Sequence, residues 1–269
     1  MTTIGLGVHY THPEHGIREV ALSQHTQKTL QMAYAPEPLL KPLRRHRVNA
    51  RPLREAVTWL QQQMTKGWIL GCSGFATAMS SDDYSIDRAV LRQLYAYLKH
   101  KNALPILTTD GGTGVGALQA NADIASQFRV PTLGCTPISA LAKDHVGPRQ
   151  RTIIGGANYK ERERLVGALP DILLCLDGKD GTLREAEMAA SCGSIVVLVS
   201  LRSYEGGPID THLRMKHLRR AVMQGRVVTC RLRRGEDVVE AFEVALKLRE
   251  WIGSTGSDRL RKIEECILS

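Results

Sequence analysis

The sequence is short of aromatic side chains, and it lacks both a long apolar run and a closely spaced cysteine pair. Phe, Trp and Tyr make up only 5% of the 269 residues, too few for the stacking platform of single-stranded nucleic-acid binders. No run approaches the roughly 20 apolar residues that span a bilayer. The six cysteines are widely spread with no CxxC pair, which argues against a disulfide framework or a zinc knuckle.

The N-terminal residues also lack a recognisable targeting pattern. Residues 1–16 are rich in His, Thr and Pro and show no basic-then-apolar signal, so we expect a cytoplasmic protein. His9, His12 and His15 cluster there, and we interpret them as part of a mobile polar tail rather than as metal ligands. We expect neither a bound metal nor another cofactor.

The net charge of +9 is unevenly distributed along the chain. Residues 1–66 hold nine Lys and Arg against four Asp and Glu, residues 67–200 hold thirteen of each, and residues 201–269 hold fourteen against ten. A polyanion could use the basic flanks through phosphate neutralisation. A solvated basic surface that favours solubility explains them more simply, so we do not expect nucleic acid as a partner.

Short apolar runs alternate with segments of helical periodicity from Gly67 onward. We expect strands at 68–70, 104–109, 132–135, 172–176, 195–200 and 226–232, and helices at 85–101, 116–128, 160–169, 182–191, 212–224 and 236–251. Residues 139–158 read as a polar connection. The alternation predicts an α/β fold, a Rossmann-like, open, mostly parallel sheet with helices on both faces.

Three regions follow from this pattern. Residues 1–66 form a basic N-terminal extension with a helix near 51–65. Residues 67–252 form the Rossmann-like nucleotide-binding domain, and residues 253–269 form a C-terminal tail.

Two glycine-rich turns each follow an apolar run and open a helix. They are Gly111-Gly-Thr-Gly-Val-Gly116 and Asp177-Gly-Lys-Asp-Gly-Thr-Leu-Arg-Glu185. Unpaired N–H groups and the helix dipole make such helix starts natural phosphate sites. The first turn is not a Walker loop, because no Gly-Lys-Ser/Thr follows it. Ligands of parallel sheets bind beyond the carboxyl ends of the strands, so we place both turns around one crevice.

The second turn is the more specific of the two. Gly178 and Gly181 let the backbone close around an anion, and Thr182 can cap the helix and donate to a phosphate oxygen. Glu185 either completes a capping box or contacts sugar hydroxyls or a water. The substrate- and phosphate-binding candidates are Ser73, Gly74, Gly111, Gly112, Thr113, Gly114, Gly178, Lys179, Asp180, Gly181 and Thr182.

Residues 67–205 resemble the nucleotide-binding superfamily often described as lysine decarboxylase-like. Its signature Pro-Gly-Gly-x-Gly-Thr-x-x-Glu is matched by residues 177–185, its Glu-Arg pair by Glu161-Arg162, and its Gly-Gly-Gly-x-x-Gly turn by residues 111–116. Its Gly-Ser-Ser turn after the first strand is matched by residues 71–74. The best-known members are the LONELY GUY-type phosphoribohydrolases.

The resemblance implies a hydrolase that cleaves the N-glycosidic bond of a nucleoside 5′-monophosphate, releasing the base and ribose 5-phosphate. Arg162 and Glu185 match the pair that the family's enzymes need, so they are the catalytic candidates. Glu185 would stabilise positive charge on the sugar and orient the attacking water, while Arg162 would hold phosphate or ribose oxygens. The resemblance also implies a homodimer.

Departures from the signature leave an alternative open. Asp177 replaces its Pro and Lys179 its second Gly. The chain could therefore be a non-catalytic sensor or carrier that binds a nucleotide or a pterin cofactor. In either case the expected partner is a phosphorylated nucleoside or a nucleotide-like small molecule. A third reading is a DNA-associated protein, because a branch of the fold that the chain resembles handles single-stranded DNA and the basic flanks permit it.

Overall fold

The computed structural model describes residues 7–12, 16–21, 47–48, 62–63, 66–76, 79–141, 147, 149–155, 158–202, 207–231 and 237–252. Its main feature is a 7-stranded sheet with strand order β10-β9-β8-β4-β5-β6-β7, in which every neighbouring pair is parallel. The strands are β4 (Ile69–Gly74), β5 (Leu107–Asp110), β6 (Thr132–Thr136), β7 (Arg151–Ile154), β8 (Ile172–Leu176), β9 (Ile195–Ser200) and β10 (Val227–Arg231). The predicted Rossmann-like α/β fold is confirmed.

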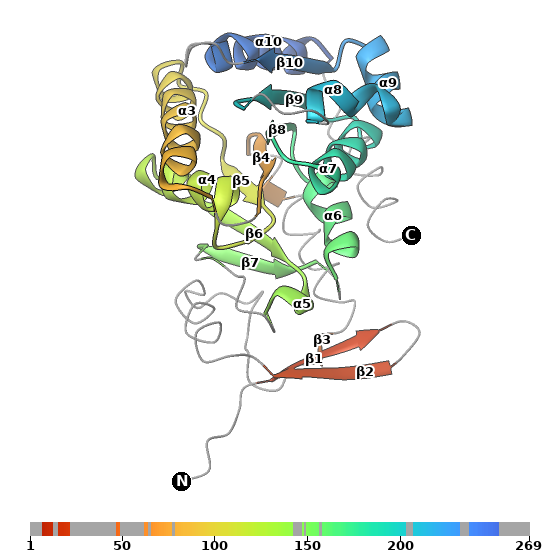
Figure 1. The fold of residues 1–269 in the computed structure, drawn as a ribbon. Coiled ribbons are helices and arrows are strands. Elements are labelled where there is room, and N and C mark those ends of the chain that lie inside the picture. Colours follow the sequence, from red (N-terminus) through yellow and green to blue (C-terminus); the bar gives the residue numbers. More distant parts are fainter. Residues whose placement is uncertain are drawn as a thin grey trace.

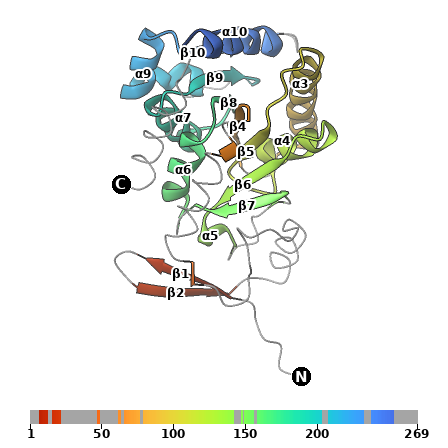
Figure 2. The same ribbon diagram turned by 180° about the vertical axis from the view of Figure 1, so that it is seen from behind.

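Helices cover both faces of this sheet. They are α3 (Ser81–His100), α4 (Gly116–Gln127), α5 (Ile138–Leu141), α6 (Tyr159–Ala168), α7 (Asp180–Ser191), α8 (Pro208–Thr211), the 3-10 helix η2 (His212–Arg214), α9 (Lys216–Met223) and α10 (Asp237–Ile252). One hydrophobic cluster joins the sheet to α3, α4 and α10, and two others join it to α6, α7 and α9. Figures 1 and 2 both show α3 and α4 on the opposite side of the strands from α6 and α7.

Burial on both faces explains why the strands read as continuous apolar runs. All five residues of β8 are buried. Ile172, Leu174 and Leu176 pack in the cluster with α3, α4 and α10. Leu173 and Cys175 pack in the cluster with α7 and α9 on the other face.

The strand order places a switch point between β4 and β8. The chain starts at β4, adds β5, β6 and β7 on one side, and then returns to place β8 on the other side of β4. The helix after β4 packs on one face of the sheet and the helix after β8 on the other. In open α/β sheets, the crevice at the carboxyl ends of two such strands is where ligands bind.

The N-terminal region contains a second, 3-stranded sheet with order β2-β1-β3. Its strands are β1 (Gly7–His12), β2 (Gly16–Ala21) and β3 (Arg47–Val48), with β1 antiparallel to β2 and parallel to β3. His9 and His12 therefore lie in a strand, and the interpretation of this segment as a mobile polar tail is wrong for them. His15, most of the helix predicted near 51–65, and the tail 253–269 lie outside the described residues.

Most element predictions for the main sheet agree with the structure, with two clear differences. The strands predicted at 172–176 and 195–200 have the observed bounds. β4 continues through Gly74, so residues 71–74 are strand and not a turn. The polar connection predicted at 139–158 is wrong, because it contains β7, a strand at the edge of the sheet.

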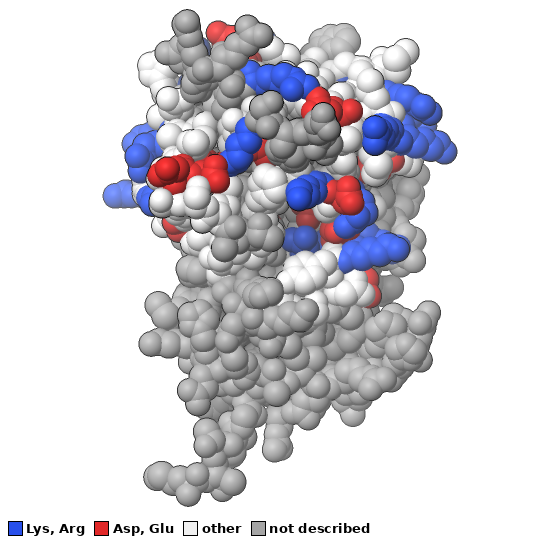
Figure 3. Space-filling model, in the orientation of Figure 1, with Lys and Arg blue, Asp and Glu red and all other residues white. Residues whose placement is uncertain are grey.

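Exposed basic side chains gather over α9. Arg214, Lys216, Arg219 and Arg220 are exposed, and Figure 3 shows a blue patch at the place that α9 occupies in Figure 1. Among the residues that the structure describes, no helix is both long and apolar enough to cross a bilayer. A cytoplasmic location stays a prediction.

Candidate functional site

Two ion pairs connect α6 with α7, and each helix contributes one acid and one base. Arg162 on α6 contacts Glu185 on α7, with Nη2 and Oε1 2.9 Å apart and side chains only 7% and 6% exposed. Arg184 on α7 donates to Glu163 on α6 through Nε at 2.6 Å and Nη2 at 2.8 Å. We call Arg162–Glu185 the inner pair, because it is buried, and Glu163–Arg184 the outer pair, because the Arg184 side chain is 48% exposed.

Ser73 joins the inner pair to the sheet. It lies near the end of β4 opposite Cys175 of β8, and its Oγ donates to Oε2 of Glu185. Both oxygens of the Glu185 carboxylate therefore accept from a side chain. Burial raises the pKa of Glu185, while Arg162 and Ser73 pull that pKa down. Three segments far apart in sequence thus meet at the switch point.

The Arg162 guanidinium is only partly satisfied. Within the described part of the chain, its buried Nε and Nη1 have no hydrogen-bond partner. Nη1 lies against Gly111, where a Cβ would come within 1.7 Å of it. Gly111 must lack a side chain here because the guanidinium occupies that space.

The turn after β5 is held by a buried ion pair that the sequence did not reveal. Arg149 Nε donates to Asp110 at 3.0 and 3.1 Å, with both side chains 0% exposed. Its Nη2 donates to the carbonyls of Thr113 at 3.1 Å and Leu118 at 3.0 Å. Asp110 Oδ1 also accepts from the N–H of Gly112 at 2.7 Å. An aspartate ending a buried strand was the available signal for this bond network.

The turn before α7 differs in detail from its prediction. The helix begins at Asp180, and the N-cap residue Lys179 makes no side-chain cap. Thr182 is therefore not the cap, and this prediction is wrong; its Oγ1 would lie 2.1 Å from a Cβ at Gly178, which has φ +95°. The capping-box reading of Glu185 is also wrong, because its carboxylate contacts Ser73 and Arg162 instead.

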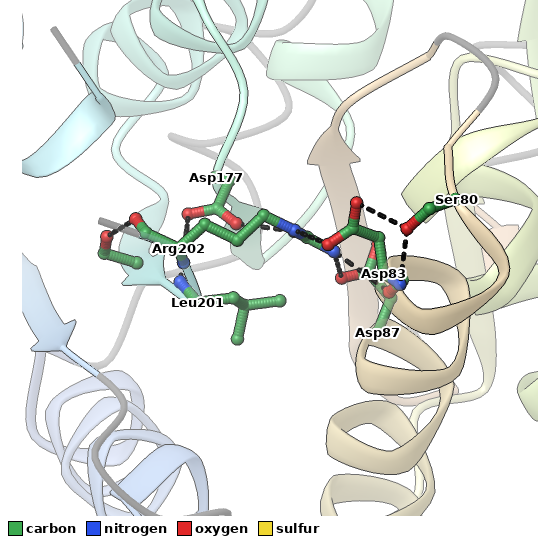
Figure 4. Close-up of polar contacts among 7 residues, drawn as sticks. Ser80, Asp83, Asp87, Asp177, Leu201 and Arg202 are labelled. Atoms are coloured by element: carbon green, nitrogen blue, oxygen red, sulfur yellow. Dashed lines mark hydrogen bonds and ion pairs between the residues drawn. The ribbon is translucent and has the colours of Figure 1, made fainter. Parts of the chain in front are cut away.

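Arg202 and three aspartates form a charged cluster that includes Asp177, the first residue of this turn (Figure 4). Arg202 Nη1 donates to Asp177 at 2.7 Å, Nη2 to Asp87 at 3.0 Å and Nε to Asp83 at 2.7 Å. Burial raises the pKa of Asp87 to about 6 and also raises the pKa of Asp177, while Arg202 opposes both shifts. The cluster ties the ends of β8 and β9 to α3.

The structure brings only some of the predicted site residues into contact. Glu185 contacts both Ser73 and Arg162, and Gly111 lies against Arg162. The remaining candidates either pack closely against neighbouring residues or are exposed. Gly74 packs on Leu176 and Ala117, Gly112 on Thr136, and Gly114 on Gly147, while Thr113 is buried and Lys179 and Asp180 are exposed.

No metal centre emerges within the described ranges. They contain no group of three or more His, Cys, Asp or Glu arranged to hold a metal ion. The five described cysteines are buried.

Comparison with known proteins assigns this chain to no family, although it aligns with several solved structures. No family model matches this chain, and no curated protein matches it. The molybdenum cofactor binding protein from Rippkaea orientalis aligns with 67% of this chain and 98% of its own at 16% identity and TM-score 0.48. The molybdenum cofactor carrier protein from Chlamydomonas reinhardtii aligns with 67% and 99% at 16% identity and TM-score 0.48. TM1055 aligns with 65% and 98% at 19% identity and TM-score 0.49.

Proposed function

We propose that this chain binds a phosphorylated, nucleotide-like small molecule at the carboxyl ends of β8, β4 and β5, as a sensor or carrier. The observation that carries this proposal is Arg162, whose Nε and Nη1 are buried without a partner among the described residues. A buried donor left unsatisfied costs about 1–3 kcal/mol, and more when it is charged. An anionic oxygen of a ligand would satisfy these donors with charge-assisted hydrogen bonds.

The first turn of α7 supports the same proposal. No side chain caps this helix, so its terminal N–H groups and its dipole favour a phosphate. Gly181 lies in that turn, and a Cβ built on it meets nothing nearer than 3.6 Å. The backbone there is open to a ligand.

The state of Glu185 favours binding over turnover. Oε1 contacts Arg162 and Oε2 accepts from Ser73. A general base has to reach the proton that it removes, whereas this carboxylate is engaged at both oxygens. Its role in the proposal is to position Arg162.

The second candidate is the phosphoribohydrolase implied by the resemblance. The observation in its favour is that Arg162 and Glu185, the expected catalytic pair, lie in contact. Burial also raises the pKa of Glu185, a condition that suits acid–base chemistry. Hydrolysis would need the carboxylate to release one of its present partners when substrate arrives.

One experiment separates the candidates. The protein is titrated with AMP, GMP, CMP and IMP in a calorimeter, and the same mixtures are analysed for free base by chromatography. A binding protein gives heat without base, and Arg162→Met lowers affinity at least about tenfold, the value of one charge-assisted hydrogen bond. Arg164→Met, at an exposed position of α6, is the matched control and should bind as the wild type does.

The other outcomes decide against the proposal. Base release that Glu185→Gln abolishes establishes the hydrolase. Absence of binding by all four nucleotides contradicts both candidates. The homodimer implied by the resemblance stays a prediction that sedimentation would test.

A further inference from the structure

We infer that Arg184 is a second anion-binding residue at the rim of this site, and that the ligand carries a diphosphate rather than a single phosphate. The inference rests on the proposed function, since it extends the same site outward. It starts from the reciprocal arrangement of the two ion pairs. Residues 162 and 163 on α6 meet residues 185 and 184 on α7, so two guanidinium groups lie on adjacent sides of one helix–helix contact.

The outer pair holds Arg184 in one pose. Glu163 accepts from both Nε and Nη2 of Arg184, at 2.6 and 2.8 Å. The Glu163 side chain is only 7% exposed, while that of Arg184 is 48% exposed. A buried carboxylate thus fixes a guanidinium that solvent and ligands can reach, and ordering it in advance reduces the entropy lost on binding.

The pose places Arg184 beside the first turn of α7. From the Cβ position of Gly181, Glu163 Oε1 is 3.6 Å away and Arg184 Nη2 is 3.9 Å away. Gly181 belongs to the uncapped turn where helix N–H groups favour a phosphate. The Nη1 group takes no part in the clamp, so it remains available to an oxygen bound at this turn.

Two phosphates fit this arrangement better than one. Arg162 has two buried donors without a partner among the described residues, and Arg184 has a side chain that is 48% exposed. The two arginines pair across the same contact between α6 and α7, Arg162 with Glu185 and Arg184 with Glu163. Adjacent phosphates of one chain would contact both, whereas a monophosphate would leave one of them unused.

A purely structural role for the outer pair makes a different prediction. Removing Arg184 would then lower stability, because the buried Glu163 carboxylate loses its partner, and it would change the affinities for AMP and ADP alike. If Arg184 binds the ligand, removing it should instead lower the affinity for the diphosphate and leave that for the monophosphate unchanged. The comparison of ligands that differ by one phosphate is therefore the decisive measurement.

The experiment measures the affinities of AMP and ADP by calorimetry in buffer containing a metal chelator. The variants are Arg184→Met and Arg184→Lys, with Arg164→Met as an exposed charge-deletion control on α6. We expect wild-type protein to bind ADP about tenfold more tightly than AMP, the worth of one hydrogen bond to a charged group. Arg184→Met should remove the preference for ADP and leave AMP affinity unchanged. Arg184→Lys should lose most of the preference, because an ammonium group lacks the planar, bidentate donors of a guanidinium. The Arg164→Met control should keep the preference.

Each alternative result is decisive. Equal wild-type affinities for AMP and ADP overturn the inference and leave the proposed function standing. A preference lowered equally by Arg184→Met and Arg164→Met overturns it too, because general surface charge would then be the cause. If AMP and ADP both fail to bind, the proposed function fails, and this inference with it.

Discussion

Arg202 holds Asp177 at the point where β8 ends and the turn before α7 begins. Nη1 of Arg202 and Oδ2 of Asp177 are 2.7 Å apart, and Oδ1 accepts from the N–H of Leu201 at 2.9 Å. Asp177 has φ +48°, a conformation that is uncommon outside glycine. The residue that replaces the signature's proline thus fixes the turn through its side chain instead of through a ring.

Asp177→Ala should therefore destabilise the fold. It removes the acceptor of the Leu201 N–H and one of the three carboxylate partners of Arg202. A lost hydrogen bond to a charged group costs about 1.5–3 kcal/mol, measured as the drop in unfolding free energy in denaturant at about pH 8. Asp82→Ala, at an exposed position of α3, should stay within about 0.5 kcal/mol of wild type. Equal effects of the two changes would show that the bond to Arg202 contributes nothing.

Asp87 should make stability depend on pH. Burial raises its pKa from 3.8 to about 6, with Asp177 and Asp83 adding to the shift and Arg202 opposing it. The folded protein then holds this proton more tightly than the unfolded chain, so the stabilisation is complete below about pH 4 and is lost as the pH rises through about 6. The unfolding free energy of wild type minus that of Asp87→Asn should fall by about 3 kcal/mol between those conditions and neutral pH. Denaturant curves across that range test this, and a difference that stays constant or grows with pH contradicts it.

The sequence was sufficient to predict the sheet because both faces of its strands are buried. A buried parallel strand must be apolar along its whole length, and the runs at 172–176 and 195–200 show this directly. β7 escaped prediction because it lies at the sheet edge and begins with the polar pair Arg151 and Thr152. Periodicity also cannot reveal strand order, on which the switch point between β4 and β8 depends.

Site residues were predictable only where they belonged to a motif of the family that the chain resembles. Arg162 and Glu185 were named from a resemblance, and the structure brings them into contact. Arg149 was seen only as part of a polar connection, because nothing local in the sequence pairs it with Asp110, 39 residues away. Buried ion pairs between distant segments depend on the folded geometry.

Arg149→Met should be among the most damaging substitutions in the chain. The guanidinium is fully buried and binds Asp110, Gln119 at 3.0 Å, and the carbonyls of Thr113 and Leu118. Its loss leaves a buried carboxylate and several acceptors unsatisfied, which costs about 3–5 kcal/mol. Thermal and denaturant unfolding measure this, with Arg92→Met at an exposed position of α3 as the control. If the two variants unfold alike, Arg149 does not hold the turn.

Gly111→Ala should displace the Arg162 guanidinium without removing it, and so test whether ligand binding depends on where the guanidinium lies. The new Cβ would lie 1.7 Å from Arg162 Nη1, so the flexible guanidinium has to move. Overpacking of this kind costs about 1–3 kcal/mol, so the protein should remain folded while AMP affinity falls at least about tenfold.

Gly225→Ala is the control for that substitution. Gly225 has φ +66° and open space around its Cβ position, so it carries a backbone cost without touching the site. Calorimetry with AMP should show unchanged affinity in this variant and weakened binding in Gly111→Ala. Wild-type affinity in a folded Gly111→Ala protein would mean that the displaced guanidinium is not what the ligand contacts. The proposed function would then lose the observation on which it depends.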